Sequence, residues 1–336
     1  MTQILTYEQL VSAEWQELVL NSRTGTWFQS PEAYAFYASV PEAMTPFAVG
    51  IARDHALVGV CVGYVTREPH AFRQFFTRRA IINGGPCLAD DATPAEAEAL
   101  MRAVRNTLCT AGKPIYIETR NFEDYSAWKG AFKAAGFGYH RHLNFHIDCT
   151  EREAMTARMS EVRRRQVRKA QKNGVTIQSE DICEADVIAF YTILAQLYRT
   201  KVKTPLFPLS FFLTFYRQGM GKYLLVKYEG KVIGGIMGPV LADRSLYEWF
   251  ICGLDASHKD CYPSVMATFA AMDYAAQQGI ARFDVMGAGQ PDVPYGVRDF
   301  KAEFGGKLVE HGRFLCICQP MLYRLGTWGV RFLKRK

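Results

Sequence analysis

An internal repeat constrains the fold of this chain more than any other feature. The stretch "AFKAAGFGYHRHLNFHIDC" (Ala131–Cys149) resembles "DFKAEFGGKLVEHGRFLCIC" (Asp299–Cys318). The two Phe-Lys pairs, Phe132-Lys133 and Phe300-Lys301, lie half a chain apart. One half of the chain therefore predicts the fold of the other.

The segments upstream of the two stretches also correspond. Each half has a predicted helix, about Ala95–Thr110 or Ser264–Gln278, followed by a glycine and an apolar strand. Further upstream, each half has two apolar runs joined by a tight hairpin turn, Asp54-His55 or Glu229-Gly230. Matching features in the same order predict a duplicated α/β (α+β) unit with mixed sheets.

The size of the chain agrees with two domains. It has 336 residues, of which 49% are apolar, so each half can bury a core. We expect the boundary where an apolar strand gives way to charged helix, with domains at 1–152 and 153–336. The second domain would include a basic linker helix at 160–173 and a basic C-terminal tail at 320–336.

Charge and cysteine content exclude few functions. The formal net charge of +7 is compatible with nucleic acid, an anionic membrane or phosphorylated substrates, and equally with a merely basic soluble protein. The nine cysteines form no CxxC pattern, and Cys316 and Cys318 alternate along an apparent strand. We expect reduced cysteines that serve as apolar filler, no metal site, no signal peptide and no membrane span.

The order of elements resembles the GCN5-related N-acetyltransferase (GNAT) fold. In that family the sheet splays open between two central strands, and the pyrophosphate of the acyl donor lies on a glycine-rich turn that opens a helix. The corresponding turn in the second half, "LDASHKDCYPSVM", lacks glycines, and the one in the first half carries two aspartates. The resemblance therefore implies the sheet but not a good coenzyme A site.

Several motifs together resemble the FemABX family of tandem-GNAT peptidyl transferases. These are "TWFQSPEAYAFY", "GGPCL", "MSEVRRRQVRKAQKNGVTI", and "GIARFDVMG" followed by "YGVRDFKAEFGGKLVEH". The similarity covers nearly the whole chain, and the last two motifs in this order are the most specific. Two features depart from the family. No helical-hairpin (coiled-coil) arm is visible, and a lysine that can follow Gln-Ser-Pro is replaced in a stretch with Tyr34, Phe36 and Tyr37.

The resemblance implies transfer of an aminoacyl group from aminoacyl-tRNA to an amine of a lipid-linked or nucleotide-linked cell-wall precursor. It implies a cytoplasmic enzyme, peripheral to the inner membrane face, without a tightly bound cofactor. A second hypothesis is an N-acyltransferase that uses acyl-CoA or an acyl carrier and acts on an envelope glycan or small amine. A third is a non-catalytic scaffold that binds membrane or RNA. The sequence does not specify the oligomeric state.

Three residues are candidates for catalysis of amide formation, which needs a proton acceptor and charge facing the oxyanion. Glu248 lies in an apolar strand, where burial would raise its pKa, or else at an edge facing solvent. Asp284 is similar, or else caps the turn after its strand. The resemblance implies that Lys301 faces the oxyanion or the donor; the alternative is a short amphipathic helix, capped by Gly305, from which Lys301 points to water.

Other residues are candidates for contacts with substrate. Tyr247 and Trp249 flank Glu248, and Tyr295 and Arg298 precede Lys301. The family resemblance adds Arg199, which would contact phosphates of the acceptor. The remaining candidates lie in the matched motifs: Gln29, Ser30, Phe300, Phe304 and Gly305.

Two basic segments are candidates for phosphate or lipid contact. In Ser160–Ile177, six cations are offset nearby only by Glu161; we expect Arg164, Arg165, Arg168 and Lys169 to bind nucleic acid or phosphate. The helix would pack through Val162, Gln166 or Val167, and Ala170. The C-terminal tail mixes apolar and basic residues, as for an anionic membrane interface. The alternatives are a solvated helix and a terminal helix docked on the domain.

Overall fold

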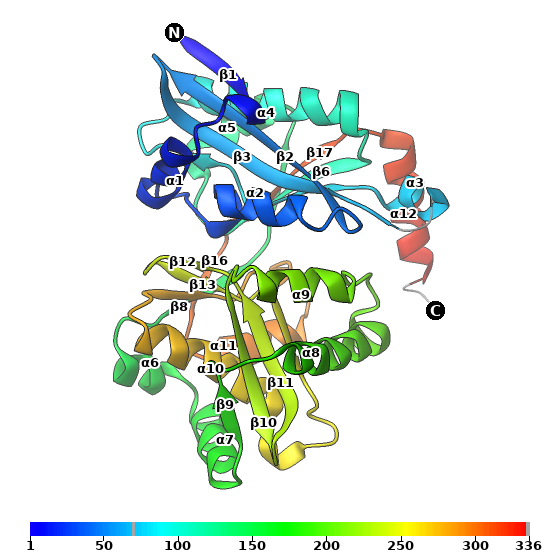
Figure 1. Cartoon of the computed structure of the whole chain (residues 1–336). Coiled ribbons are helices and arrows are strands. Elements are labelled where there is room, and N and C mark those ends of the chain that lie inside the picture. Colours follow the sequence, from blue (N-terminus) through cyan, green and yellow to red (C-terminus); the bar gives the residue numbers. More distant parts are fainter. Residues whose placement is uncertain (69–70, 334–336) are drawn as a thin grey trace. The chain divides into compact units, whose positions relative to one another are not determined.

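The computed structural model describes residues 1–68 and 71–333, without the side chains of 71–73, 111–112 and 327–333. The chain forms two compact units, shown in Figure 1: unit 1 comprises Met1–Arg141 with His311–Lys336, and unit 2 comprises His142–Glu310. The predicted boundary at 152/153 therefore differs from the observed one. It falls within unit 2 because the strand before it pairs there, and the last strand of the chain returns to unit 1.

Unit 1 is built on one continuous sheet, with strand order β1-β2-β3-β4-β6-β17-β7. β4 and β6 are parallel, and the other pairs are antiparallel. A short strand, β5 (Cys87–Leu88), pairs with β3. The strands of the main path are β1 (Thr2–Thr6), β2 (Met44–Arg53), β3 (Ala56–Thr66), β4 (Ala80–Gly84), β6 (Tyr116–Asn121), β7 (Gly138–His140) and β17 (Arg313–Ile317).

The helices of unit 1 begin and end at recognisable residues. Ser30 caps α2, and Thr93 and Glu96 form a capping box at the start of α4. The predicted hairpin turn is confirmed, because both Asp54 and His55 have positive φ. The helices are α1 (Ser12–Asn21), α2 (Pro31–Ala38), α3 (Ala71–Thr77), α4 (Pro94–Thr107), α5 (Lys129–Ala134) and α12 (Pro320–Leu333).

Unit 2 has two sheets instead of one. The four-stranded sheet has the order β14-β11-β10-β9, and the five-stranded sheet has the order β12-β13-β15-β8-β16. The second predicted hairpin turn, Glu229-Gly230, is also confirmed by positive φ at both residues. The strands are β8 (Asn144–Asp148), β9 (Thr176–Gln178), β10 (Lys222–Tyr228), β11 (Lys231–Gly238), β12 (Val240–Leu241), β13 (Ser245–Tyr247), β14 (Phe250–Gly253), β15 (Arg282–Asp284) and β16 (Lys307–Val309).

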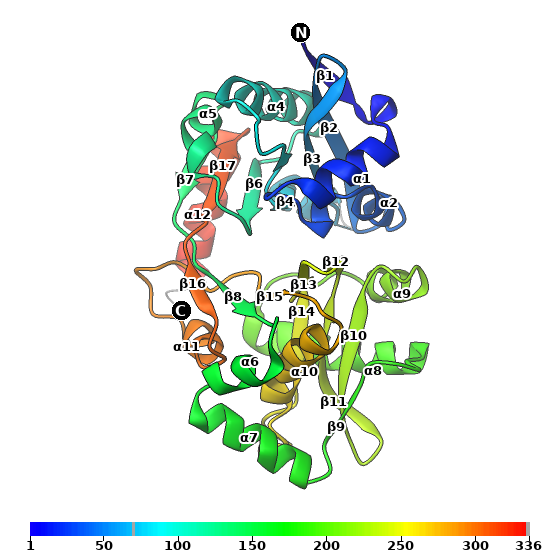
Figure 2. The same cartoon turned by 90° about the vertical axis from the view of Figure 1, so that its left-hand side faces the viewer.

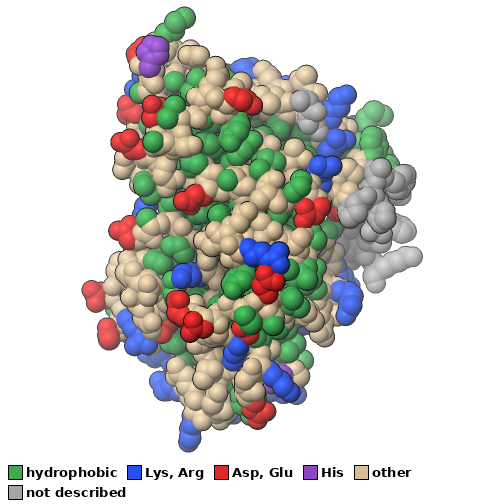
Figure 3. Space-filling view, viewed as in Figure 1, with side chains coloured by type: hydrophobic (Ala, Val, Ile, Leu, Met, Phe, Trp, Pro, Cys, Tyr) green, Lys and Arg blue, Asp and Glu red, His purple; other side chains and the backbone are tan. Residues whose placement is uncertain are grey.

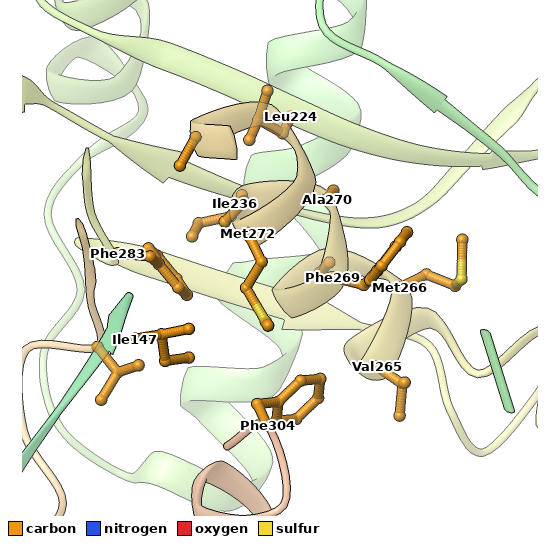
Figure 4. Close-up of a cluster of buried hydrophobic side chains, with 14 of the residues drawn as sticks. Ile147, Leu224, Ile236, Val265, Met266, Phe269, Ala270, Met272, Phe283 and Phe304 are labelled. Carbon is orange, nitrogen blue, oxygen red and sulfur yellow. The ribbon is translucent and has the colours of Figure 1, made fainter. Parts of the chain in front are cut away.

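The core of unit 2 surrounds α10, which is apolar on nearly all sides. Met266, Phe269 and Met272 of this helix pack with Phe283 and Phe304, as Figure 4 shows. A helix that is buried all round needs no amphipathic pattern. The helices of unit 2 are α6 (Arg152–Arg158), α7 (Glu161–Lys172), α8 (Glu184–Leu197), α9 (Leu209–Arg217), α10 (Pro263–Gln277) and α11 (Gly296–Ala302).

The two repeats exchange a strand. β8, the last strand of the first repeat, lies between β15 and β16 of unit 2. β17, the last strand of the second repeat, lies between β6 and β7 of unit 1. The chain therefore passes from one unit to the other along both connections, which can be followed in Figure 2. Each unit is completed by a strand from the other repeat.

One pair of cysteines departs from the prediction of reduced thiols. Cys109 and Cys318 of unit 1 form a disulfide with a Cα–Cα distance of 5.7 Å. The prediction failed because the pairing depends on β17 joining unit 1. Of the seven other cysteines, all but Cys183 are buried, as expected for apolar filler.

Neither a membrane-spanning helix nor a metal-binding cluster was predicted. Within the described ranges, no helix is long and apolar enough to cross a bilayer. The same part of the chain holds no group of three or more His, Cys, Asp or Glu side chains arranged to bind a metal.

Candidate active site

The sheet of unit 2 divides at Glu248 and Trp249, between β13 and β14. β13 pairs in parallel with β15, whereas β14 pairs antiparallel with β11. The Glu248 N–H donates to the Asp284 carbonyl (2.9 Å), and the Trp249 N–H donates to the Met237 carbonyl (3.1 Å). The backbone of Glu248 is thus held on the five-stranded side of the division, and that of Trp249 on the four-stranded side.

A buried ion pair lies at this division. Lys301, in the last turn of α11, has its Nζ 2.7 Å from Glu248 Oε1. Lys301 is 8% exposed and Glu248 is 7% exposed. The predicted alternatives in which either side chain faces solvent are therefore wrong. Two charges removed from water in this way need each other, because removing one partner leaves the other buried and unpaired.

The ammonium of Lys301 is fully occupied. Besides Glu248, it donates to the carbonyls of Val285 (2.7 Å) and Gly287 (3.0 Å). An ammonium has three N–H donors, so each has an acceptor. Nothing among the described residues donates to the other carboxylate oxygen, Glu248 Oε2. The free acceptor of the pair therefore belongs to Glu248.

A second polar cluster lies beside the pair, around Asp284. Its Oδ1 accepts from Asn144 Nδ2 (2.8 Å) and from the Met286 N–H (2.7 Å), and its Oδ2 lies 3.2 Å from His146 Nε2. The predicted capping role of Asp284 is confirmed, since a bond to the N–H two residues on is an Asx turn. Asp284 is 0% exposed.

The two carboxyl groups are shifted in opposite directions. Burial raises the pKa of Glu248; Asp284 adds to the rise, and Lys301 opposes it. Burial alone would also raise the pKa of Asp284, but its contacts with His146, Arg282 and Asn144 hold it below its usual value. Carboxyl groups whose pKa values are pushed apart suit different roles. Glu248 therefore binds a proton more readily than an ordinary glutamate, and Asp284 less readily than an ordinary aspartate.

Residues 157–301 match a family model described as an acetyltransferase (GNAT) domain. This segment of the chain is a GNAT-type acetyltransferase domain. The matched segment includes Glu248 and Asp284 and ends at Lys301. No curated protein sequence matches the chain.

Solved structures show the same fold over the whole chain. FemX is 15% identical, with 96% of this chain and 99% of that chain covered and a TM-score of 0.72. A tandem GNAT protein from the clavulanic acid biosynthesis pathway is 9% identical, with 95% and 99% covered and a TM-score of 0.58. The C-terminal domain of a putative lysylphosphatidylglycerol synthetase from Agrobacterium fabrum is 11% identical, with 90% of each covered and a TM-score of 0.54. The predicted FemABX-like tandem GNAT fold is confirmed.

In this GNAT unit, a carboxylate of the protein accepts a hydrogen bond from the first turn of α10. Asp255 accepts from the Ser264 N–H (3.1 Å) and also from the Ser264 hydroxyl. The turn before α10 corresponds to the segment where GNAT proteins place the donor pyrophosphate. A carboxylate there satisfies the helix N-terminus and repels phosphate. This contact adds a physical reason to the absence of glycines.

The basic helix α7 presents unneutralised charge. Lys169 pairs with Asp260 (2.7 Å), and Arg163 pairs with Glu303 (3.2 Å). Arg165, Arg168 and Lys172 are exposed, and none of them is paired with an acidic side chain in the described part of the chain. Basic side chains are visible at the lower edge of Figure 3, at the place of α7 in Figure 1.

The packing of α7 differs in part from the prediction. Val167 and Ala170 are buried as expected, but Val162 is 47% exposed. Val162 lies in the first turn, where Arg163 instead turns inward, with its guanidinium 4.6 Å from the centre of the Phe300 ring. Arg164 donates to the Ala157 carbonyl, so its charge is partly used within the unit.

The candidates near Lys301 have structural contacts. Phe304 is fully buried, and Phe300 packs against the same core. Gly305 has a φ of 77°, and a Cβ there would lie 2.4 Å from the Arg158 carbonyl oxygen. The C-cap of α11 is Glu303, so Gly305 lies two residues beyond it and is not the predicted cap; its lack of a side chain admits the backbone at Arg158.

The other candidates of unit 2 lie at varied depths. Tyr247 is fully buried, and Trp249 packs on Phe211, with ring centroids 5.2 Å apart. Tyr295 is 43% exposed, while Arg298 donates to the carbonyls of Gln290 and Val293. Arg199 is exposed in the turn after α8. Their roles in substrate binding stay predictions.

Gln29 and Ser30 lie in unit 1 and are used by its backbone. The Gln29 amide bonds Val62 through both its oxygen (2.8 Å) and its nitrogen (2.9 Å), and the nitrogen also donates to the Asn83 carbonyl. Ser30 Oγ accepts from the Ala33 N–H and donates to the Trp27 carbonyl. Their assignment to substrate stays a prediction that these contacts do not support.

Three polar residues of the site went unnoticed in the sequence: Asn144, His146 and Asp255. Asn144 and His146 alternate along β8, a period of two that places both on one face of a strand. That signal was available. The sequence alone did not show that β8, the last strand of the first repeat, pairs with strands of unit 2.

Proposed function

We propose that this acyltransferase moves an aminoacyl group from aminoacyl-tRNA to an amine of a lipid-linked or nucleotide-linked cell-wall precursor. The observation that carries the proposal is the buried Glu248–Lys301 pair at the division of the GNAT sheet. It offers one free carboxylate oxygen where GNAT proteins hold the acyl donor. The reaction would take place in the cytoplasm, where charged tRNA is found.

Glu248 acts as the general base in the proposed reaction. The acceptor amine attacks the ester carbonyl, so an N–C bond forms and the C–O bond to the terminal ribose of the tRNA breaks. The proton lost by the nitrogen passes to Glu248 Oε2 and then to the departing ribose oxygen, which regenerates the carboxylate. The step needs no further reactant.

Lys301 acts through Glu248 in this scheme. Its Nζ holds Oε1 at 2.7 Å, which fixes the carboxylate and leaves Oε2 available. An oxyanion could bond Lys301 only by displacing one of its three acceptors. We therefore assign Lys301 a positioning and electrostatic role, instead of the direct contact with the oxyanion that the family resemblance implied.

Two features favour tRNA over coenzyme A as the donor. The carboxylate of Asp255 at the start of α10 repels the pyrophosphate of an acyl-CoA. The exposed cations of α7 suit the backbone of a nucleic acid, which carries a phosphate at every nucleotide. The second candidate, an acyl-CoA N-acyltransferase, is favoured only by the description of the family model.

The acceptor and the membrane contact rest on less specific features. Exposed Arg199 suits a phosphate of the precursor. In α12, Tyr323 packs on Tyr116 with ring centroids 5.7 Å apart, which agrees with a docked terminal helix, while Met321 is 82% exposed. The predicted basic tail extends to 334–336, which lie outside the described residues. We propose that this end of the chain touches anionic lipid near the acceptor.

Donor binding tests the proposal most directly. Purified protein would be titrated with charged tRNA, uncharged tRNA and acetyl-CoA at moderate salt and again at high salt. We expect tighter binding of charged tRNA, and loss of that preference in Lys301→Met but not in the exposed control Lys133→Ala. Tight acetyl-CoA binding with no preference for charged tRNA would overturn the donor assignment.

A further inference from the structure

We propose that Asn144 and His146 are positioning residues for the Glu248–Lys301 pair. They fix the turn at Asp284–Gly287, and the carbonyls of this turn hold Lys301. The proposal deepens the proposed function, because it treats this pair as the proton-transfer centre. It gives the exchanged strand β8 a part in the chemistry of unit 2.

Asn144 holds the turn at two points. Its Nδ2 donates to Asp284 Oδ1 (2.8 Å), and its Oδ1 accepts from the Gly287 N–H (2.8 Å). The amide is 3% exposed, so these bonds have no competition from bulk water. One side chain thus spans the turn from its first residue to its last.

His146 lies beside the other oxygen of Asp284. Its Nε2 lies 3.2 Å from Asp284 Oδ2, and its Nδ1 lies 3.5 Å from an Arg282 guanidinium nitrogen. A donor on Nε2 and an acceptor on Nδ1 correspond to one tautomer of the neutral ring. Arg282 is in turn held by Ser245 Oγ (2.9 Å). Hydrogen bonds therefore fix Asp284 through Oδ1, and Oδ2 faces the His146 ring.

The turn needs this support, because its backbone is in an unfavourable conformation. Met286 has a φ of 54°, in the left-handed region that is unfavourable for a residue with a side chain. Bonds from its own N–H to Asp284 and from the Gly287 N–H to Asn144 offset that cost. Backbone strain of this kind persists only where the surroundings enforce it.

The position of Lys301 depends on this turn. Two of the three acceptors of its ammonium are the carbonyls of Val285 and Gly287, which lie on either side of Met286. If the turn relaxed to an ordinary conformation, both carbonyls would reorient. Lys301 would then lose two of its bonds, and Glu248 would lose its fixed partner.

The register of β8 places these two side chains beside Asp284. His146 lies directly opposite Asp284 across the β8–β15 pair, and Asn144 lies two residues away on the same face. In unit 1, the corresponding positions on β17 relative to Glu118 are Leu315 and Arg313. The amide and the imidazole therefore occur only in the unit with the buried lysine.

The first experiment needs no substrate. Residue-resolved hydrogen–deuterium exchange would be measured for wild type and Asn144→Ala, with Arg313→Ala as the matched control on the other exchanged strand. We expect exchange at the Met286 and Gly287 amides to be about tenfold faster in Asn144→Ala, the loss expected for one hydrogen bond. Arg313→Ala should leave these amides unchanged. Unchanged exchange in folded Asn144→Ala would overturn the proposal.

A second measurement reports on Lys301 itself. Its modification by a small amine-reactive reagent should be slow in wild type and about tenfold faster in Asn144→Ala and His146→Leu. His146→Gln, which keeps a donor for Asp284, should remain close to wild type. Equal rates for the leucine and glutamine variants would show that His146 serves packing only. These two readouts decide the proposal even if no donor yet tested supports turnover.

Where a donor has been identified, turnover separates positioning from binding. Asn144→Ala should lower kcat by about tenfold to a hundredfold with KM for the donor nearly unchanged, because small misplacements of reacting groups have effects of this size. A raised KM with unchanged kcat would assign Asn144 to substrate binding and overturn the positioning role. Failure of wild type to turn over any donor would count against the proposed function alone.

Discussion

The two units share an order of elements but differ at the centre of their sheets. In unit 1, β4 pairs along its whole length with β6, so the sheet is continuous. In unit 2, the equivalent strand is divided between two sheets at Glu248. The two units thus share an order of elements, but among the described residues only unit 2 has its sheet divided at this strand.

The register of the exchanged strands makes the comparison more specific. Glu118 of unit 1 lies opposite Leu315, just as Asp284 of unit 2 lies opposite His146. Yet Glu118 is paired with two arginines, Arg120 (2.9 Å) and Arg313 (3.0 Å), which lower its pKa to about 2 despite burial. Glu118 is therefore paired on both sides within unit 1, whereas Glu248 of unit 2 keeps one carboxylate oxygen without a donor among the described residues.

The largest expected effect comes from removing the proposed base. Glu248→Gln should lower kcat by roughly 10²- to 10⁴-fold, the range for loss of a general base. Steady-state turnover with the donor found by titration would measure it. The matched control is Glu118→Gln, which should keep its turnover per folded molecule. Equal losses in both variants would mean that the difference between the units does not concern catalysis.

The pH dependence of turnover should identify Glu248 as the titrating group. The base must be ionised, so activity should rise with pH through the pKa of Glu248, which burial raises above its ordinary value. Lys301 opposes that rise, so Lys301→Met should move the acid limb of kcat/KM to higher pH. A pH–rate profile of both proteins checks this. A limb that stays in place would exclude Glu248 as the base.

The disulfide distinguishes the two exchanged strands. Cys318 directly follows β17 and is bonded to Cys109, whereas Cys149 directly follows β8 and is a buried free thiol. Cys109→Ser should lower the free energy of unfolding of oxidised protein by about 2–4 kcal/mol, because the bond closes a long loop. Denaturant titration would show this, and the difference should vanish in reductant. Persistence of the difference in reductant would attribute it to packing.

The stability of unit 1 at acid pH should depend on Glu118. Because the pKa of Glu118 is lowered to about 2, its contribution to stability is present above its ordinary pKa and is lost as the pH falls towards 2. The contribution is at most about 3 kcal/mol, from the size of the shift. Protection factors of the β6 amides, which correct for the slower intrinsic exchange at low pH, should fall in wild type as the pH is lowered. In Glu118→Gln, the β6 amides should be less protected at neutral pH, and their protection should change less with pH.

The sequence predicted much of this molecule, for identifiable physical reasons. The repeat, the hairpin turns and the glycines at helix ends are local signals, and they gave the element order correctly. The strand exchange was missed because β8 and β17 look alike, and local pattern does not specify which sheet accepts a strand. Because the strand exchange was not predicted, Asn144, His146 and the Cys109–Cys318 pair were not predicted either. Lys301 and Glu248 were identified singly, but their contact depends on long-range packing.

The smallest expected effect concerns a surface feature of unit 2, the exposed charge of α7. In unit 1, α1 carries Glu14 and Glu17 and no lysine or arginine.

If α7 binds tRNA, the double variant Arg165→Gln with Arg168→Gln should bind tRNA about tenfold more weakly. The slope of log K against log salt should fall by about 1 to 2, as expected for two lost phosphate contacts. The preference for charged over uncharged tRNA should survive, because that preference depends on Glu248 and Lys301. Filter binding at several salt concentrations separates the two quantities. Loss of the preference with an unchanged salt slope would place the phosphate contacts elsewhere and leave α7 a solvated helix.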